Sequence, residues 1–161
     1  MKTISKLLLV VCATVSLTSC LTSEYNSTPM IYTNGKYIFR TTAAGVNDTI
    51  LYGDTVQVAD TLRAPLVLWG GYNNLVSFQA TLDTSVFDYH LEYDTTCIPY
   101  LDEDSKPESG YLHFTNNCCQ MPVTLWYVPK KSGDYTIHFT ISSTAAEKFS
   151  PNTGYFQQPV R

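Results

Sequence analysis

The part of the sequence after residue 20 lacks the features of several large protein classes. None of its apolar runs approaches the roughly 20 residues that a membrane-spanning helix needs. The whole chain has 10 Lys and Arg against 14 Asp and Glu, and its only adjacent basic pair is Lys130 and Lys131. A surface that binds nucleic acid needs clustered basic residues. The composition therefore predicts no nucleic-acid partner, and the lack of a Gly-x-Ser-x-Gly sequence excludes one common nucleophile motif.

The N-terminal residues follow a different pattern. Lys2 and Lys6 precede an apolar run over residues 7–17, and the small residues Thr18 and Ser19 follow it. A basic start, a short apolar run and a small-residue end are typical of a secretory signal peptide, and the run is too short to span a bilayer. The alternative is a buried helix that ends by chance at a cysteine. We expect residues 1–19 to be a helical signal peptide.

Residues 17–20, Leu-Thr-Ser-Cys, resemble the lipobox of bacterial lipoproteins. The resemblance implies that Cys20 becomes the first mature residue and carries a diacylglyceryl thioether and an N-acyl chain such as palmitate. More than one acyl chain makes a membrane anchor durable. The resemblance also implies attachment to the outer membrane, facing the periplasm or the cell surface, because Leu21 stands where the inner-membrane retention signal has aspartate.

The remaining residues divide into a short polar stretch and a longer body. Residues 20–30 are mostly small and polar and lack periodicity, which predicts a flexible tether. Residues 31–161 are enough for a single domain with a sizeable core.

Short stretches rich in aromatic and β-branched residues recur through this body, separated by turn residues. Val76, Phe78, Ala80 and Leu82 alternate with polar residues, as expected of a strand with one buried face. The expected strands cover residues 36–42, 48–52, 54–60, 65–69, 75–82, 87–93, 111–115, 122–128, 134–142 and 154–160. Pro159 predicts an edge position for the last of them.

So many short strands without a long helix predict an all-β fold, a two-sheet sandwich of roughly 7–10 antiparallel strands. A lipocalin-like barrel is the competing architecture. Residues 131–139, which include Gly133 and Tyr135, resemble the start of a late strand in immunoglobulin-like domains. The resemblance implies an immunoglobulin-like sandwich in which the Tyr135 hydroxyl bonds back to the preceding loop.

Three cysteines remain after the leader: Cys97, Cys118 and Cys119. Exported proteins meet oxidising conditions, so we expect one disulfide and one free thiol. A disulfide from Cys97 to Cys118 or Cys119 would close a loop of about 22 residues, which would stabilise the fold by roughly 3 kcal/mol in the chain-entropy model. A bridge between the two adjacent cysteines needs a strained geometry.

The histidines and the acidic loop do not form a recognisable metal motif. His90, His113 and His138 all occupy outward positions of expected strands, and a two-His site would require His113 and His138 to lie on paired strands. Asp102, Asp104 and Glu108 offer oxygen ligands, but the glycine and final glutamate of a calcium loop are missing. We expect neither a metal nor a cofactor.

The turn after the expected strand 65–69 has the composition of a sugar-binding surface. Trp69 and Tyr72 supply aromatic rings, and Asn73 and Asn74 supply amide groups. The alternative is a hairpin turn whose Trp69 covers the core. Glycan is the ligand that this hypothesis predicts.

Two functions remain open. The first is a non-catalytic, lipid-anchored module of the bacterial envelope that binds glycan or another envelope protein, and the sequence favours it. The second is an envelope glycan hydrolase that uses two carboxylates about 5–10 Å apart. The acids available for it are Asp83, Asp88, Glu92 and Asp94.

Overall fold

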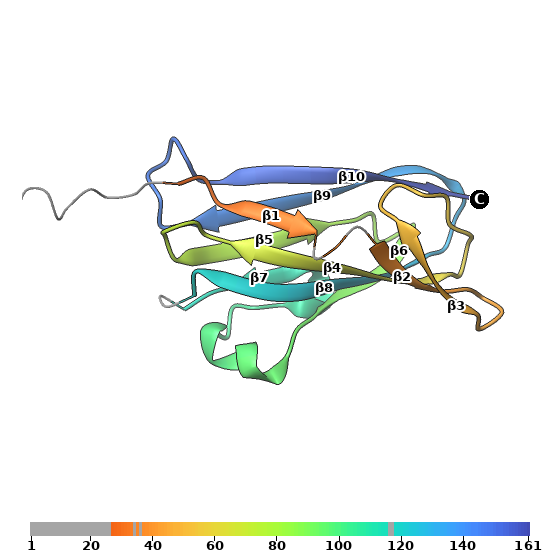
Figure 1. The fold of residues 1–161 in the computed structure, drawn as a ribbon, viewed down its shortest axis with the longest axis horizontal. Helices are drawn as coiled ribbons and strands as arrows, with labels where there is room; N and C mark the ends of the chain where they lie inside the picture. Colours follow the sequence, from red (N-terminus) through yellow and green to blue (C-terminus); the bar gives the residue numbers. More distant parts are fainter. Residues whose placement is uncertain (1–26, 34, 36, 116–117) are drawn as a thin grey trace, which may run out of the picture.

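The chain folds into a sandwich of two antiparallel sheets (Figure 1). A computed structural model describes residues 27–33, 35, 37–115 and 118–161. The strands are β1 Met30–Thr33, β2 Tyr37–Thr41, β3 Asn47–Leu51, β4 Thr61–Trp69, β5 Leu75–Thr81, β6 Phe87–Glu92, β7 Tyr111–His113, β8 Gln120–Pro129, β9 Gly133–Ser143 and β10 Asn152–Val160. Two 3₁₀ helices, η1 Thr95–Tyr100 and η2 Pro107–Ser109, lie between β6 and β7.

The larger sheet has the order β3-β2-β4-β8-β6, and β1 also pairs with β4. The smaller sheet has the order β10-β9-β5-β7. The described strands thus form two separate sheets and not one closed barrel, so the predicted two-sheet sandwich is confirmed. β10 lies at an edge, as Pro159 predicted. Within the part of the chain that the structure describes, no helix has the length and apolar character of a membrane span.

β1 is a strand that the sequence did not predict. Its four residues pair with the C-terminal part of β4, whereas β2 pairs with Thr61–Arg63 of the same strand. Pro65 lies between these two pairings, and its register partner is Thr124 of β8 on the other side of β4. The Pro65 carbonyl accepts a hydrogen bond of 2.9 Å from the Tyr52 hydroxyl.

The predicted tether over residues 20–30 differs from the structure at its C-terminal end. Met30 belongs to β1, and Pro29 is buried with its carbonyl accepting from Asn152 Nδ2 at 2.8 Å. The backbone N–H of Tyr72 donates to Ser27 Oγ at 3.1 Å. Chain positions 27–30 therefore belong to the folded body. The predicted signal peptide and Cys20 lie outside the described residues.

Period-two alternation builds the core, as the sequence predicted. Phe78 and Ala80 of β5 are fully buried, and the Phe78 ring stacks on Phe139 of β9 with centroids 5.9 Å apart. The register of β5 against β9 shifts between Leu75 and Ser77. This irregularity buries Leu75 and leaves Val76 only half-buried, because an extra residue in one strand reverses the facing of its neighbours.

Residues 54–60, which we expected to form a strand, form a loop. The hydrogen bond that we expected from the Tyr135 hydroxyl is present. Residues 54–60 make a single bridge, between Val56 and Val160, and otherwise form turns. The buried Asp60 carboxylate accepts a hydrogen bond from the backbone N–H of Gln57 at 2.9 Å. This bond stabilises a turn here, where the sequence predicted hydrogen bonds between strands. The Tyr135 hydroxyl donates to the Ser132 carbonyl at 2.9 Å, as the immunoglobulin-like resemblance implies.

Candidate ligand-binding face

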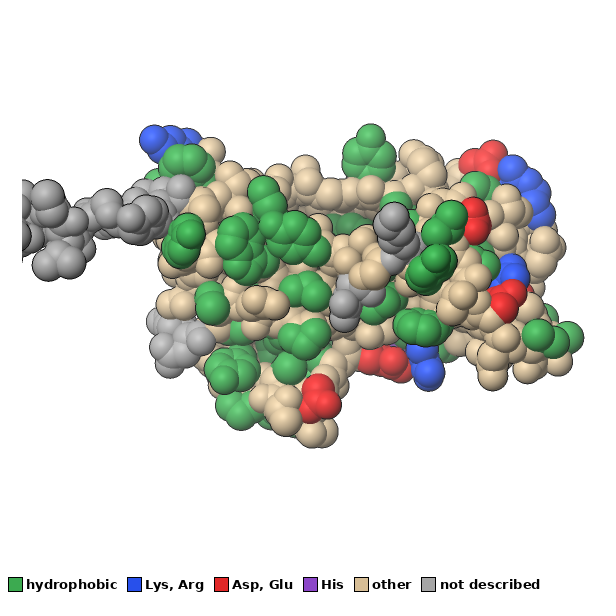
Figure 2. Space-filling view, viewed as in Figure 1, with side chains coloured by type: hydrophobic (Ala, Val, Ile, Leu, Met, Phe, Trp, Pro, Cys, Tyr) green, Lys and Arg blue, Asp and Glu red, His purple; other side chains and the backbone are tan. Residues whose placement is uncertain are grey.

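The side of the larger sheet that faces away from the core carries exposed aromatic side chains. Tyr32, Tyr37 and Phe39 are each about half exposed, at 46%, 53% and 57%. Figure 2 shows apolar side chains gathered on this face over β1 and β4. A contiguous apolar patch on a folded protein commonly marks a binding surface. We call this side of the larger sheet the outer face.

A shelf of two aromatic rings lies where β1 meets β4. The centroids of Tyr32 and Trp69 are 6.1 Å apart, and the rings are tilted by 52°. With Val67 and Gln120 they line a hollow of about 200 Å³. Strand register creates this arrangement, because Tyr32 pairs with Val67 and Trp69 pairs with Gln120. These four residues are the Trp69 shelf.

The structure splits the ligand-binding set predicted from the sequence. Trp69 lies on the outer face, whereas Tyr72, Asn73 and Asn74 lie in the turn at the end of the sandwich. The backbone N–H of Asn73 donates to the Gly70 carbonyl at 3.2 Å, and that of Asn74 donates to Thr144 Oγ1 at 3.2 Å. The Tyr72 side chain is 77% exposed. Sequence reasoning missed Tyr32, because β1 had no recognisable strand signal.

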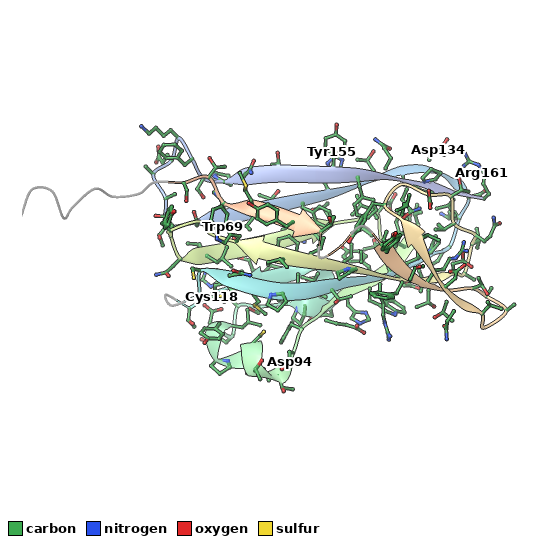
Figure 3. All side chains as sticks on the ribbon, in the orientation of Figure 1. Trp69, Asp94, Cys118, Asp134, Tyr155 and Arg161 are labelled. Atoms are coloured by element: carbon green, nitrogen blue, oxygen red, sulfur yellow. The ribbon has the colours of Figure 1, made fainter. Side chains whose placement is uncertain are left out.

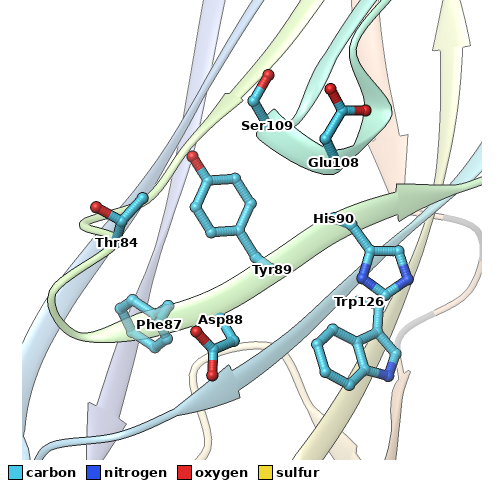
Figure 4. A pocket seen from close by; sticks show the side chains of 8 residues that line it. All are labelled: Thr84, Phe87, Asp88, Tyr89, His90, Glu108, Ser109 and Trp126. Atoms are coloured by element: carbon cyan, nitrogen blue, oxygen red, sulfur yellow. The ribbon is translucent and has the colours of Figure 1, made fainter.

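A second aromatic pair lies on the outer face where β6 meets β8 (Figure 4). The rings of His90 and Trp126 stack with centroids 4.6 Å apart, and these residues are register partners. Asp88 and Glu108 contribute carboxylates to the same hollow of about 340 Å³. Trp126 also pairs with Arg63, six residues before Trp69 on β4. At strand spacing the two tryptophans are therefore about 20 Å apart along the sheet.

The four predicted catalytic acids are mostly engaged in structural contacts. Hydrogen bonds from Ser85 lower the pKa of Asp83, and the backbone N–H of Thr96 lowers the pKa of Asp94. A general acid in a glycosidase needs the opposite shift, a raised pKa. The Asp94 carboxylate also caps the start of η1, because it accepts a hydrogen bond from the backbone N–H of Thr96.

The other two predicted acids face basic partners. Lys130 Nζ lies 2.9 Å from Asp88 Oδ1, and Arg63 Nε lies 3.7 Å from Glu92 Oε2. Glu92 and Asp94 do line one shared hollow of about 330 Å³, where β6 ends beside Pro65 of β4 and Thr124 of β8. Of the four acids, Glu92 and Asp94 thus share a hollow. The lowered pKa of Asp94 disfavours the protonated form that a general acid needs.

The three cysteines of the domain are free thiols, so the predicted disulfide is not formed in the structure. Cys118 is buried and its thiol donates to the Gln120 carbonyl at 3.5 Å. Burial raises the pKa of this thiol. Cys119 is exposed in the bend before β8. Cys97 is buried in η1.

The acidic loop and the histidines are arranged differently from the sequence hypotheses. His113 Nδ1 lies 2.5 Å from Asp102 Oδ2, and this bond is the first cause of the lowered pKa of Asp102. Asp102, Asp104 and His113 each place one potential metal ligand within 4.8 Å of the others, while Glu108 lies in the hollow of Figure 4. The Asp102–His113 bond joins two of these three side chains.

The hypothetical two-histidine site is not formed between the described strands. His113 pairs with Ser77 and His138 pairs with Thr81, so β5 separates the two histidines. His138 instead lies beside Tyr155 on the outer side of the smaller sheet, with ring centroids 6.2 Å apart.

Comparison with known proteins gives similarity in structure only. No family model and no curated protein matches the chain. Similar solved structures include BspA_C_WT, at 11% identity and a TM-score of 0.49 over 81% of this chain, and BspA_C_mut, at 12% identity and a TM-score of 0.47 over 81%. This chain spans 50% and 46% of their lengths. A family 123 glycoside hydrolase from Clostridium perfringens is similar at 13% identity and a TM-score of 0.39, over 84% of this chain and 27% of the hydrolase.

Proposed function

We propose that this chain is an exported, lipid-anchored β-sandwich that serves as a non-catalytic binding module of the bacterial envelope. Cys20 attaches it to the outer membrane, and the outer face of the larger sheet binds glycan. The leader, with its basic start, short apolar run and Leu-Thr-Ser-Cys ending, supports export and acylation.

The observation that carries the binding proposal is the Trp69 shelf. Aromatic rings present flat apolar surfaces to the C–H faces of sugars, while their polar atoms and nearby amides bond to hydroxyl groups. The shelf has two rings 6.1 Å apart and the Gln120 amide beside them. Exposing this much aromatic surface costs solvation free energy, which a ligand would recover by covering it.

Glycan hydrolysis is the less well supported alternative. Glu92 and Asp94 share a hollow, which is the observation in its favour. Its mechanism would need one of the two to stay protonated at neutral pH. The Thr96 hydrogen bond lowers the pKa of Asp94 and so favours the ionised form.

A glycan-binding screen followed by titration of the best ligand tests the binding module. We expect Trp69→Ala and Tyr32→Ala each to weaken binding by at least about tenfold, since aromatic anchors dominate such contacts. Tyr155→Ala is the matched control, because Tyr155 is 70% exposed beside His138 on the opposite sheet. Equal losses in all three variants, or none in the shelf variants, would reject the Trp69 shelf as the site.

A further inference from the structure

We infer that one end of the sandwich rests on the lipid surface, so that the strands stand along the membrane normal. This end carries Ser27, the turn with Tyr72, the Tyr100 region of η1 and the loop with Lys148 and Phe149; we call it the near end. The inference rests on the proposed acylation of Cys20 and adds an orientation to it.

Chain length places the near end close to the membrane. Seven residues lead from Cys20 to Ser27, and an extended chain of that length spans at most about 25 Å. Ser27 is held at the near end, because its Oγ accepts from the backbone N–H of Tyr72. The longest strand, β9, has 11 residues and so extends about 36 Å. A tether of at most about 25 Å from Ser27 therefore cannot bring the anchor to the opposite end of the sandwich, about 36 Å away.

Hydrogen bonds show that separate loops meet at the near end. The backbone N–H of Thr144 donates to the Asn74 carbonyl at 2.8 Å, which joins the loop after β9 to the Tyr72 turn. The N–H of Gly70 donates to the Cys119 carbonyl at 2.8 Å, and the N–H of Thr115 donates to the Tyr100 carbonyl at 2.9 Å. η1 is thus tied to the segment that enters β8 beside Trp69. Figure 3 shows Trp69 and Cys118 toward this end, with Asp134 and Arg161 at the other.

The side chains of the near end have the chemistry of a membrane–water interface. Tyr72 is 77% exposed, Ile98 is 56% exposed and Tyr100 is 42% exposed. Lys148 holds its ammonium group 4.9 Å from the centroid of the Phe149 ring. Tyrosine is enriched at the level of lipid headgroups, and lysine reaches from apolar surroundings to the water. Glu147 precedes Lys148 in the sequence and balances its formal charge, so we expect no requirement for anionic lipid.

The orientation assigns different partners to the two parts of the predicted Trp69–Asn74 site. In this orientation Tyr72 faces lipid. Trp69 lies on the outer face, which is perpendicular to the membrane plane and faces the aqueous side. The His90–Trp126 hollow lies farther from the anchor on that same face. A glycan chain in the envelope could therefore contact both aromatic pairs while the anchor stays in place.

Fluorescence quenching by brominated phosphatidylcholine tests the orientation in the full-length, acylated chain. In a Trp69→Phe/Trp126→Phe background, Tyr72→Trp places a probe at the near end and Val46→Trp places one in the turn between β2 and β3. Val46 is 59% exposed, so both substitutions are at solvent-facing positions. We expect the Tyr72→Trp protein to lose most of its emission in brominated relative to unbrominated vesicles, and the Val46→Trp protein to keep its emission.

The outcomes separate the orientation from the anchoring. A chain that floats with the vesicles but shows no quenching at Tyr72→Trp, or equal quenching at both probes, overturns the orientation and leaves the anchor standing. A chain from an acylating host that does not float with the vesicles overturns both.

Discussion

Gln158 joins the two sheets through a buried hydrogen-bond network. Its Oε1 accepts from the hydroxyl of Tyr127 on the opposite sheet at 2.6 Å, and its Nε2 donates to the Asp54 carbonyl at 2.8 Å. Both side chains are fully buried. Burial raises the pKa of Tyr127 well above its usual value, so the hydroxyl stays protonated and remains a donor. Buried polar groups of this kind stabilise a fold only when every partner is present.

Tyr127→Phe should therefore destabilise the domain. It removes the donor and leaves Gln158 Oε1 buried without it, which costs about 1–3 kcal/mol. Urea unfolding monitored by circular dichroism measures the loss as a lower midpoint with an unchanged slope. Gln157→Ala on the same strand is the control, because Gln157 is exposed; its change should stay within about 0.5 kcal/mol. A Tyr127→Phe protein as stable as the parent would show that the network contributes nothing.

Alkylation should distinguish the three thiols of the domain. Cys119 is exposed, whereas Cys97 and Cys118 are buried and burial raises the pKa of Cys118. Since the thiolate is the reactive form, iodoacetamide at a pH of about 8 should modify Cys119 first. Peptide mapping by mass spectrometry reads the order, and urea-unfolded protein should show all three modified together. Early modification of Cys118 in folded protein would contradict the buried position.

The pair of Asp102 and His113 should make stability depend on acid pH. Its hydrogen bond lowers the pKa of Asp102 in the folded state. The stabilisation is therefore complete above the unfolded value of about 3.9 and is lost as the pH falls through the lower folded value. Asp102→Asn should reduce stability at neutral pH and reduce it progressively less as the pH falls below about 3.9, because protonation of Asp102 removes the same contribution from the parent.

Urea midpoints at several pH values measure this effect. Glu103→Gln supplies the control, since Glu103 is an exposed neighbour in the same loop. A constant difference between Asp102→Asn and the parent across the acid range would show that the carboxylate charge plays no part.

At the scale of elements, strand register decides what the outer face can bind. β4 carries Trp69 at one end and pairs Arg63 with Trp126 near the other, so two aromatic pairs lie about 20 Å apart along one face. A small sugar can occupy only one of them, whereas an extended glycan can occupy both. If the outer face binds glycan as we propose, a polymer should therefore bind it better than a monosaccharide.

Binding should accordingly depend on glycan length. Trp126→Ala should weaken binding of a long oligosaccharide by about tenfold and leave a short one unchanged, if the short one occupies the Trp69 shelf. Trp69→Ala should weaken both. Isothermal titration with an oligosaccharide series measures the two patterns, and Tyr155→Ala controls for changes elsewhere on the surface. Equal losses for short and long ligands in Trp126→Ala would contradict a two-site face.

At the scale of the whole molecule, the proposed export and acylation would change the covalent structure. Protein purified from membranes of its native source should lack residues 1–19 and carry acyl chains on Cys20. Intact-mass measurement tests both changes at once, and Cys20→Ala should abolish the lipid and release the protein from the membrane fraction. A mass that includes the leader, with an unmodified Cys20 thiol, would reject the anchor.

Local patterns in the sequence predicted most of the strands. Alternation in β9 puts Ile137, Phe139 and Ile141 inside and His138 outside, as observed. This prediction succeeds because successive side chains of any strand point to opposite faces, whatever the partner strand is. It fails where a bulge intervenes, as at Val76, and where a short stretch becomes a strand only through its partner, as β1 does on β4.

The sequence by itself determined an all-β body with its inward and outward faces, because both follow from the order of residues along each strand. Only the tertiary structure decided that Tyr32 lies beside Trp69, that Tyr72 belongs to the end of the sandwich next to Ser27, and that Asp102 meets His113. These contacts join residues from 11 to 45 positions apart. They depend on how distant segments pair, and no local pattern encodes that register.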